Sequence, residues 1–329
     1  MEPLRIGILG AARIAASFVK GVAPSTEVSV RCVASRDPER GQAFAEAHGV
    51  PKAVDSYEEL LASPRIDAVY IPLTNDQHLR WSLKALAAGK HVLCEKPLAL
   101  RAKDVGELYA AARTHGRVLV EAFPYRFQPQ TLDLLHRVRS GSLGLLRHVS
   151  GEFGFPLSRP DDYRLDAGKG GGALWDVGVY PLSMIRALAG SLPEQVQALA
   201  HERGGVDHGL AATLRWANGM TATLACRFDC FGYRAIRILG ERAALASGFH
   251  NHVDESQAWV EIHDQPGYAS RREAVAPGNG FQLEAEAFAA LVRGEPAHPL
   301  WPTEAETRET TRLVEALLRS VQEGRAVRP

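Results

Sequence analysis

Short apolar runs alternate with helical patterns through the first third of the chain, and this alternation constrains the fold more than any other feature. We expect strands at Leu4–Leu9, Val28–Ala34, Ala68–Pro72, His91–Cys94 and Arg117–Glu121. We expect helices between them at Arg13–Gly21, Pro38–His48, Ser56–Ala62, Asp76–Ala88 and Ala102–Thr114. Strands and helices that alternate over short loops form parallel sheets with helices on both faces. The pattern therefore predicts an α/β domain with a doubly wound parallel sheet.

Longer runs with alternating apolar residues replace this pattern after Phe123. We expect a helix at Pro129–Ser140, strands at Leu146–Phe155, Gln195–His201, Leu210–Trp216, Thr221–Phe228 and Arg234–Leu239, and helices at Phe281–Val292 and Thr303–Glu323. Asn218-Gly219 is a hairpin signal between two of the strands. Strands grouped in this way predict an α+β domain on an antiparallel or mixed sheet. A boundary near Ala122 gives domains at 1–122 and 123–329.

Composition excludes several classes of function. The 329 residues include 38 Lys+Arg and 38 Asp+Glu, so no basic excess predicts nucleic-acid binding. The chain begins MEPLRIGILG without signal-peptide features, and no apolar run is long enough to span a membrane, so we expect a cytoplasmic protein. The cysteines lack the spacing of zinc ligands, so we expect reduced thiols and no metal site. They are Cys32, Cys94, Cys226 and Cys230.

A phosphate-binding loop is predicted where the first strand meets the first helix. Gly10–Ala15 reads GAARIA, a G-x-A-x-x-A variant of the dinucleotide fingerprint G-x-G-x-x-G/A. Gly10 can make the tight turn, and the helix N-terminus attracts phosphate. Ala12 departs from the fingerprint, because a glycine there normally lets the backbone approach the pyrophosphate.

The end of the second strand discriminates between the two nicotinamide cofactors. NAD-specific proteins place a carboxylate here for the ribose 2′-hydroxyl, whereas Ser35 and Arg36 can bind a 2′-phosphate. The sequence therefore predicts NADP(H) over NAD(H). Asp37 is the competing feature, since a shift of one residue would put a carboxylate at this position.

Two further segments follow strands on the edge of the sheet where ligands bind. Leu73–His78 follows one of them, and its Asn75 or Asp76 can cap the next helix, which leaves His78 open to a structural role. Glu95-Lys96-Pro97 follows the next strand, where a lysine can meet a bound substrate. An ordinary exposed lysine at a strand end is the alternative.

The second domain contains a triglycine followed by a largely apolar helical segment, Gly170–Tyr180. Asp176 and Tyr180 are four residues apart and so share one helix face. A carboxylate and a phenol need partners if they are buried there. Their alternative roles are structural, as a capping aspartate and a core tyrosine.

Taken together, these motifs resemble the Gfo/Idh/MocA oxidoreductases. The resemblance rests on Gly7-Ile8-Leu9-Gly10, Asn75–His78, Glu95-Lys96-Pro97, Glu121-Ala122-Phe123 and Gly170–Tyr180. Within the family, the chain is similar to NADP-dependent sugar dehydrogenases, anhydrofructose reductases and dimeric dihydrodiol dehydrogenases. That similarity rests on Ala34-Ser35-Arg36, Glu121–Phe127, Tyr163–Asp166 and the tyrosine at 180, where inositol dehydrogenases have a histidine.

The resemblance implies an N-terminal Rossmann domain and a C-terminal domain whose open, largely antiparallel sheet makes homodimer or higher homo-oligomer contacts. It implies a cofactor site of Gly10, Ala12, Arg13, Ile14, Ser35, Arg36, Leu73, Thr74, Asn75, His78, Glu95 and Lys96. The implied catalytic residues are Lys96, Tyr180 and Asp176, and Arg126 and Arg164 are added as substrate contacts. For both arginines a surface salt bridge is the alternative.

The implied reaction is hydride transfer between nicotinamide and a carbinol carbon of a sugar, cyclic polyol or related diol. Tyr180 is the expected proton-transfer residue. A free tyrosine has a pKa of about 10, and the Lys96 ammonium would favour its phenolate. Lys96 itself is the alternative proton-transfer group. A sugar oxidoreductase that recycles a tightly bound cofactor, and a non-catalytic dinucleotide sensor, are the alternative functions.

Overall fold

The computed structural model describes residues 2–253, 256–265 and 269–329, which form two compact units. The first unit contains the chain up to Phe127 together with Asn279–Glu304, and the second contains Gln128–Gly278 and Ala305–Pro329. The chain therefore leaves the first unit, builds most of the second, and then returns. Among the described residues, no helix is both long and apolar enough to cross a membrane.

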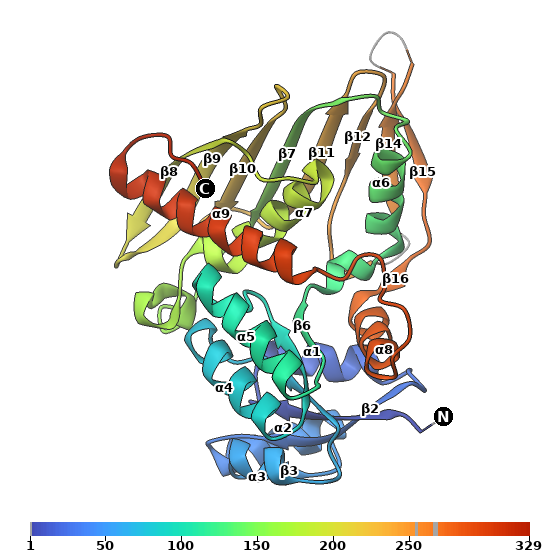
Figure 1. Cartoon of the computed structure of the whole chain (residues 1–329), viewed down its shortest axis with the longest axis vertical. Helices are drawn as coiled ribbons and strands as arrows, with labels where there is room; N and C mark the ends of the chain where they lie inside the picture. Colours follow the sequence, from blue (N-terminus) through green and yellow to red (C-terminus); the bar gives the residue numbers. More distant parts are fainter. Residues whose placement is uncertain (1, 254–255, 266–268) are drawn as a thin grey trace. The chain divides into compact units, whose positions relative to one another are not determined.

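The first unit is built on a six-stranded parallel sheet of order β3-β2-β1-β4-β5-β6 (Figure 1). Its strands are β1 (Leu4–Leu9), β2 (Val28–Ala34), β3 (Ala53–Val54), β4 (Ala68–Ile71), β5 (His91–Glu95) and β6 (Leu119–Ala122). The order turns back between β1 and β4, which is the switch point where such sheets bind ligands. The predicted Rossmann architecture is thus confirmed.

Helices cover both faces of this sheet, because its strands are apolar on both sides. The helices are α1 (Arg13–Val22), α2 (Pro38–His48), α3 (Tyr57–Ala62), α4 (Asn75–Ala87), α5 (Ala102–Thr114) and α8 (Gly280–Val292). One core joins the sheet to α1, α2 and α8, and the other joins it to α3, α4 and α5. Phe281 and Phe288 bring α8, from far along the chain, into the first of these cores.

The second unit is built on an eight-stranded sheet of order β15-β14-β12-β11-β7-β10-β9-β8. Its strands are β7 (Leu146–Gly154), β8 (Gln195–Arg203), β9 (Val206–Arg215), β10 (Thr221–Arg227), β11 (Tyr233–Gly240), β12 (Ala244–Ser247), β14 (Trp259–His263) and β15 (Arg271–Ala274). Among the described residues, β7 and β10 are the only neighbouring strands of this sheet that pair in parallel, so the expected largely antiparallel sheet is confirmed. The predicted hairpin at Asn218-Gly219 joins β9 to β10.

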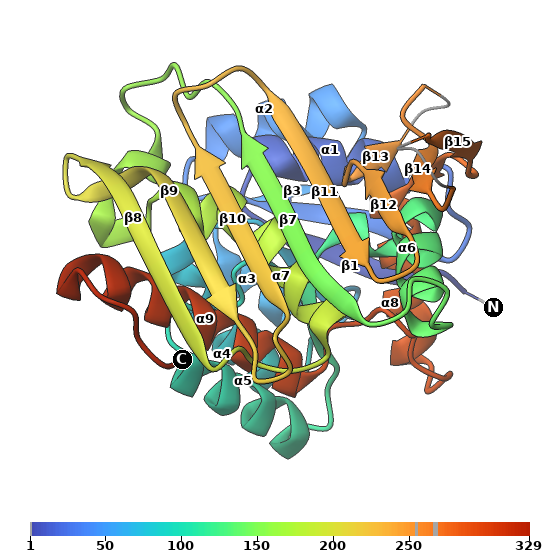
Figure 2. The ribbon, with the colours of Figure 1, turned by 90° about the horizontal axis from the view of Figure 1, so that it is seen from above.

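Helices lie behind this sheet in Figure 2, and its near face is open. The helices of the unit are α6 (Pro129–Arg139), α7 (Val179–Ala189) and α9 (Glu304–Glu323), and a short pair of strands, β13 (His252–Val253) and β16 (Gly278–Asn279), is separate from the sheet. α7 packs closely on β7, since a Cβ on Gly151 would lie 2.6 Å from Cβ of Pro181. Buried Ile236 and Ile238 alternate along β11 with exposed Arg237 on the open side.

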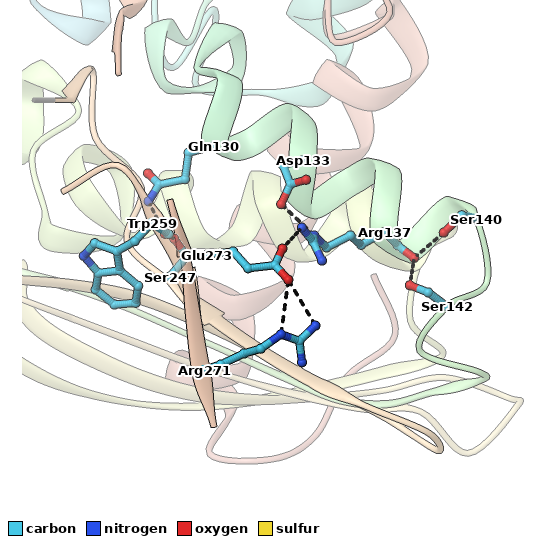
Figure 3. A network of polar contacts seen from close by, with 9 residues as sticks. All are labelled: Gln130, Asp133, Arg137, Ser140, Ser142, Ser247, Trp259, Arg271 and Glu273. Atoms are coloured by element: carbon cyan, nitrogen blue, oxygen red, sulfur yellow. Dashed lines mark hydrogen bonds and ion pairs between the residues drawn. The ribbon is translucent and has the colours of Figure 1, made fainter. Parts of the chain in front are cut away.

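A polar network fixes α6 to the β14–β15 edge (Figure 3). Arg137 pairs with Asp133 on its own helix at 2.7 Å and with Glu273 of β15 at 2.6 Å, and Arg271 binds the same Glu273 at 3.0 Å. Gln130 donates to the carbonyl of Trp259 at 2.8 Å. These contacts hold β14 and β15, two strands that were not predicted, and the charged sequence of β15 gives no strand signal.

Candidate functional site

The loop after β1 has the form of a phosphate-binding turn. Gly10 has φ of 112°, a conformation that favours glycine, and its amide donates to the carbonyl of Ala34 at 2.8 Å. Ala12 is the N-cap of α1, and no side chain among the described residues caps that helix. A helix N-terminus of this kind can bind an anion through its first amides.

Two arginines flank the end of β2, next to this loop. Arg36 interacts with the phenol of Tyr57, while Arg40 donates to the carbonyl of Ala11 at 2.8 Å. Burial raises the pKa of Tyr57, and both arginines act in the opposite direction. Asp37 accepts the amide of Arg40 at 3.1 Å as the N-cap of α2. The sequence analysis missed Arg40 and Tyr57, which come near β2 only through the fold.

The expected helix cap after β4 is wrong. α4 begins at Asn75, its N-cap is Thr74, and the Thr74 hydroxyl donates to Asp76 at 2.6 Å instead of capping the helix. Asn75 is a buried residue of the first helical turn. The helix starts one residue earlier than predicted, so neither Asn75 nor Asp76 occupies the cap position.

His78 ties together the loops that follow β4 and β5. Its buried ring lies between the carbonyls of Pro97, 2.8 Å from Nδ1, and Leu73, 3.0 Å from Nε2. Burial lowers the pKa of His78, and a neutral imidazole donates to only one of the two carbonyls. The structural alternative considered for His78 fits this environment. The Lys96–Pro97 peptide bond beside it is cis.

Buried carboxyl groups surround the strand end that carries Lys96. Glu95 accepts the hydroxyl of Tyr70 at 2.6 Å, and Glu121 accepts the amide of Leu98 at 2.9 Å. Glu284 of α8 accepts the amide of Phe123 at 2.6 Å. Burial raises the pKa of Glu284 well above its ordinary value, and the nearby Glu95 acts in the same direction. Glu95 and Glu121 are thus engaged within the core of the first unit.

In the second unit, the segment that carries Asp176 is a π-helical turn, Leu174–Gly178, which runs directly into α7. The spacing of residues in this segment predicted an ordinary helix, whereas the structure has a wider π turn there. Such turns recur at functional sites. Tyr180, in the first turn of α7, is 7% exposed and packs edge-on against Phe153, with ring centroids 5.3 Å apart.

Arg164 binds Asp176 directly. The Nε–Oδ2 distance is 2.6 Å, and a second nitrogen of Arg164 lies 3.1 Å from Asp162. Burial alone would lower the pKa of Arg164, but the Asp176 carboxylate raises it overall. Since Asp176 is 6% exposed, this pair is not the exposed salt bridge that was the alternative for Arg164. Arg126, in contrast, is buried in the first unit, in the short helix Pro124–Phe127.

A buried aspartate that the sequence analysis missed supports the triglycine. Asp207 of β9 accepts the amide of Leu174 at 2.7 Å, at the start of the π turn. Burial raises the pKa of Asp207 to about 6, although the bond from Leu174 acts in the opposite direction. A Cβ on Gly172 would lie 2.2 Å from the Asp207 carboxylate, so a glycine is required there.

The two units each contain part of the predicted site. Lys96, Arg126 and the whole predicted cofactor site belong to the first unit, and Asp176, Tyr180 and Arg164 belong to the second. The structure brings Asp176 together with Arg164, and it brings Arg40 into contact with the turn after β1. The pairing of Lys96 with Tyr180 stays a prediction.

Two protein-family models match successive parts of the chain. Residues 4–123 match the family described as oxidoreductase family, NAD-binding Rossmann fold, and residues 131–246 match the GFO/IDH/MocA C-terminal domain. The chain is 34% identical to D-xylose 1-dehydrogenase (NADP(+)) 2 of Haloferax volcanii, over 98% of this chain and 99% of that protein. It is 39% identical to trans-1,2-dihydrobenzene-1,2-diol dehydrogenase of Mus musculus, over 68% of each chain.

A solved structure has the same fold over nearly the whole chain. It is a 3-ketoreductase from Actinomadura kijaniata in complex with NADP and TDP-benzene, with a TM-score of 0.89 and 30% identity. The match covers 97% of this chain and 98% of that one. From both domains and from these relatives, the chain belongs to the Gfo/Idh/MocA family of oxidoreductases.

Proposed function

We propose that the protein is an NADP(H)-dependent dehydrogenase or reductase that acts on a CH–OH group of a sugar, cyclic polyol or related diol. The observation that carries the proposal is the buried pair of functional groups on one helix, the Asp176 carboxylate and the Tyr180 phenol. The ion pair to Arg164 and the cap from Asp207 hold that helix segment in place. The relatives that act on xylose and on a dihydrodiol support the substrate class.

The residues of the first unit fit a dinucleotide phosphate. The turn at Gly10 and the uncapped start of α1 would hold the pyrophosphate. Ser35, Arg36 and Arg40 would bind the 2′-phosphate, because guanidinium groups match phosphate geometry. Asp37, the carboxylate that would favour NAD(H), is engaged instead as the N-cap of α2, which supports the preference for NADP(H). When bound, the nicotinamide supplies the hydride donor or acceptor.

The protein must hold the substrate and move one proton. In this proposal Tyr180 exchanges the proton of the reacting hydroxyl, and a positive charge at Lys96 would favour its phenolate form. The Lys96 ammonium can also hold the substrate oxygen, and direct proton transfer by Lys96 is the alternative. Asp176 orients substrate hydroxyls or Lys96, and Arg164 fixes the Asp176 carboxylate.

The open face of the eight-stranded sheet is the proposed contact between copies of the chain. Leu199 is 75% exposed and Tyr233 is 55% exposed on this sheet. Exposed apolar groups on a sheet face are typical of protein contacts. Light scattering behind a sizing column is expected to give a homodimer or larger homo-oligomer, and a monomer at all concentrations would contradict the proposal.

A turnover screen tests the function. Sugars, cyclic polyols and diols are offered with NADP⁺ and with NAD⁺, and the corresponding carbonyl compounds with the reduced cofactors, while absorbance of the reduced nicotinamide is followed. We expect turnover with at least one member and a preference for NADP(H). Tight NADPH binding without turnover of any member would favour the dinucleotide sensor instead.

A further inference from the structure

Arg234 is a charged residue on the helix-covered side of the eight-stranded sheet. It is paired across the sheet with Phe153 of β7, and its guanidinium carbon lies 4.2 Å from the centre of the Phe153 ring. The same ring packs against Tyr180. Arg234 therefore lies beside the residue proposed to move the proton, and all three residues belong to the second unit.

The direction of this side chain follows from the alternation along β11. Ile236 and Ile238 share its side of the strand and are buried under the helices. Arg237 lies on the other side and is exposed. Arg234 is half-buried, so its charge has lost part of its hydration.

No carboxylate among the described residues forms an ion pair with this charge. Within residues 2–253, 256–265 and 269–329, no ion pair or hydrogen bond of the Arg234 side chain is found, and its contact with Phe153 is a cation–π interaction. Burial lowers the pKa of Arg234, and Tyr180 and Asp176 only partly offset this. An arginine nevertheless stays protonated in a protein.

Arg164, the other arginine near Tyr180, differs from Arg234 because it has carboxylate partners. Arg164 binds Asp176 and Asp162, so the carboxylate nearest to Tyr180 on its own helix already has a guanidinium partner. A partly desolvated charge without a partner costs free energy, which an added anion can recover. Arg234 is thus left without an ion-pair partner among the described residues, and its guanidinium contacts the same aromatic ring as Tyr180.

We propose that Arg234 binds an anionic group of the substrate, a carboxylate or a phosphate, and that the substrate is therefore an acidic or phosphorylated sugar or polyol. The guanidinium fork can bind either group through two parallel hydrogen bonds. The cation–π contact with the Phe153 ring orients the guanidinium group. This inference rests on the proposed function, because it takes Tyr180 as the position of the reacting hydroxyl.

Matched ligands test the proposal. The probes are D-glucose, D-glucuronate and D-glucose 6-phosphate, with the same three forms of D-galactose, titrated calorimetrically into the full chain in the presence of NADP⁺. We expect at least one anionic form to bind more tightly than its neutral parent. The form that gains affinity shows whether the bound group is a carboxylate or a phosphate.

Three variants test whether Arg234 is responsible for the tighter binding of the anionic form. Arg234→Gln is expected to weaken binding of the anionic form by roughly 10- to 100-fold, the usual effect of losing a charge-assisted pair, and to leave the neutral sugar nearly unchanged. Arg234→Lys keeps the charge and is expected to retain part of the preference. Arg237→Gln removes a charge from the exposed side of the same strand and is expected to have no effect.

The outcomes separate this inference from the proposed function. Equal affinity of the wild-type protein for neutral and anionic forms, or an unchanged preference in a folded Arg234→Gln protein, would overturn the inference. Turnover of neutral sugars in either of those cases would leave the proposed function standing. Arg234-dependent binding of an anion without turnover of any substrate would support the inference and contradict the proposed function.

Discussion

Gly172 and Asp207 lie so close that a single methyl group on the glycine would reach the carboxylate. The Cβ position of Gly172 is 2.2 Å from Oδ1 of Asp207. The other oxygen of Asp207 accepts the amide of Leu174, with which the π turn begins. The helix that carries Asp176 and Tyr180 therefore depends on a contact between the triglycine and a strand thirty or more residues away in sequence.

Gly172→Ala tests this contact. The alanine is strained at φ of 118° and also displaces Asp207, so we expect a loss of about 2–4 kcal/mol in the free energy of unfolding. Gly219→Ala is the control, because Gly219 has φ of 85° but no atom within 4 Å of its Cβ position. Chemical denaturation measures both, and equal losses would show that displacement of Asp207 costs nothing.

Arg164→Met is expected to destabilise the protein, because it leaves two buried carboxylates without their partner. Full burial of such a pair would make the loss about 3–5 kcal/mol, and the quarter exposure of Arg164 reduces our expectation to about 1–3 kcal/mol. Adding Asp176→Asn is expected to restore part of the stability. Arg159→Met breaks an exposed pair with Asp161 and is the control. A loss equal to that of the control would contradict the role of burial.

Glu284→Gln tests the pH dependence of stability. Because its pKa is raised in the folded protein, Glu284 keeps a proton that the unfolded chain releases above pH of about 4.3. Its contribution to stability is therefore present below that pH and is lost as the pH rises toward the folded pKa. Glutamine accepts the amide of Phe123 in the same way and stays neutral.

We expect Glu284→Gln to gain stability relative to the wild type as the pH increases from 4.5 to 8, as measured by urea denaturation. Glu241→Gln is the control, because hydrogen bonds lower the pKa of the exposed Glu241. This variant is therefore expected to lose stability relative to the wild type as the pH increases. A stability difference between wild type and Glu284→Gln that does not change with pH would mean that Glu284 is ionised in the fold.

Arg36→Ala and Arg40→Ala test cofactor preference. Each removes a guanidinium from the end of β2, so we expect KM for NADP⁺ to rise by about 10- to 100-fold while KM for NAD⁺ changes little. Arg31→Ala, which removes an exposed arginine from the middle of the same strand, is the control. If wild-type protein uses both cofactors equally, or if neither variant changes the ratio, the NADP assignment fails.

Tyr180→Phe and Lys96→Met test the proton transfer. Each is expected to reduce kcat by roughly 10²- to 10⁴-fold, the usual contribution of a general acid or base, while NADPH binding measured by fluorescence persists. Phenylalanine keeps the packing against Phe153, so the Tyr180 variant isolates the hydroxyl. Near-normal turnover in both variants would remove them from the mechanism.

The spacing of apolar residues predicted most of the helices and strands. It failed where contacts with distant parts of the chain determine the local structure. All the Rossmann strands except β3 are short apolar runs with clear boundaries, so their sequence alone identifies them. β3, which is only Ala53–Val54, is too short to give such a signal and was not predicted. β15 reads Arg271-Arg272-Glu273-Ala274 and has no apolar face, because its partners are the charged residues of α6 and β14. Residue spacing also does not distinguish a π turn from an α turn, so Asp176 was placed in an ordinary helix.

Candidate site residues stand out in the sequence where they belong to a motif, and they do not where they come from distant strands. Lys96, Asp176 and Tyr180 follow recognisable segments. Asp207 and Arg234 lie on β9 and β11 with unremarkable neighbours in sequence, and their roles depend on the helix that packs above them. Single sequences contain no local signal for such contacts.

The position of α8 has a consequence for synthesis of the chain. The nucleotide-binding unit begins at the N-terminus, but Ala285 and Phe288 of α8 complete the core around Phe18 of α1. The ribosome therefore has to make Gln128–Gly278, the larger part of the second unit, before the first unit can close. Until then the growing chain exposes an apolar side of its earliest helix, and this is the stage at which we expect the protein to depend most on chaperones.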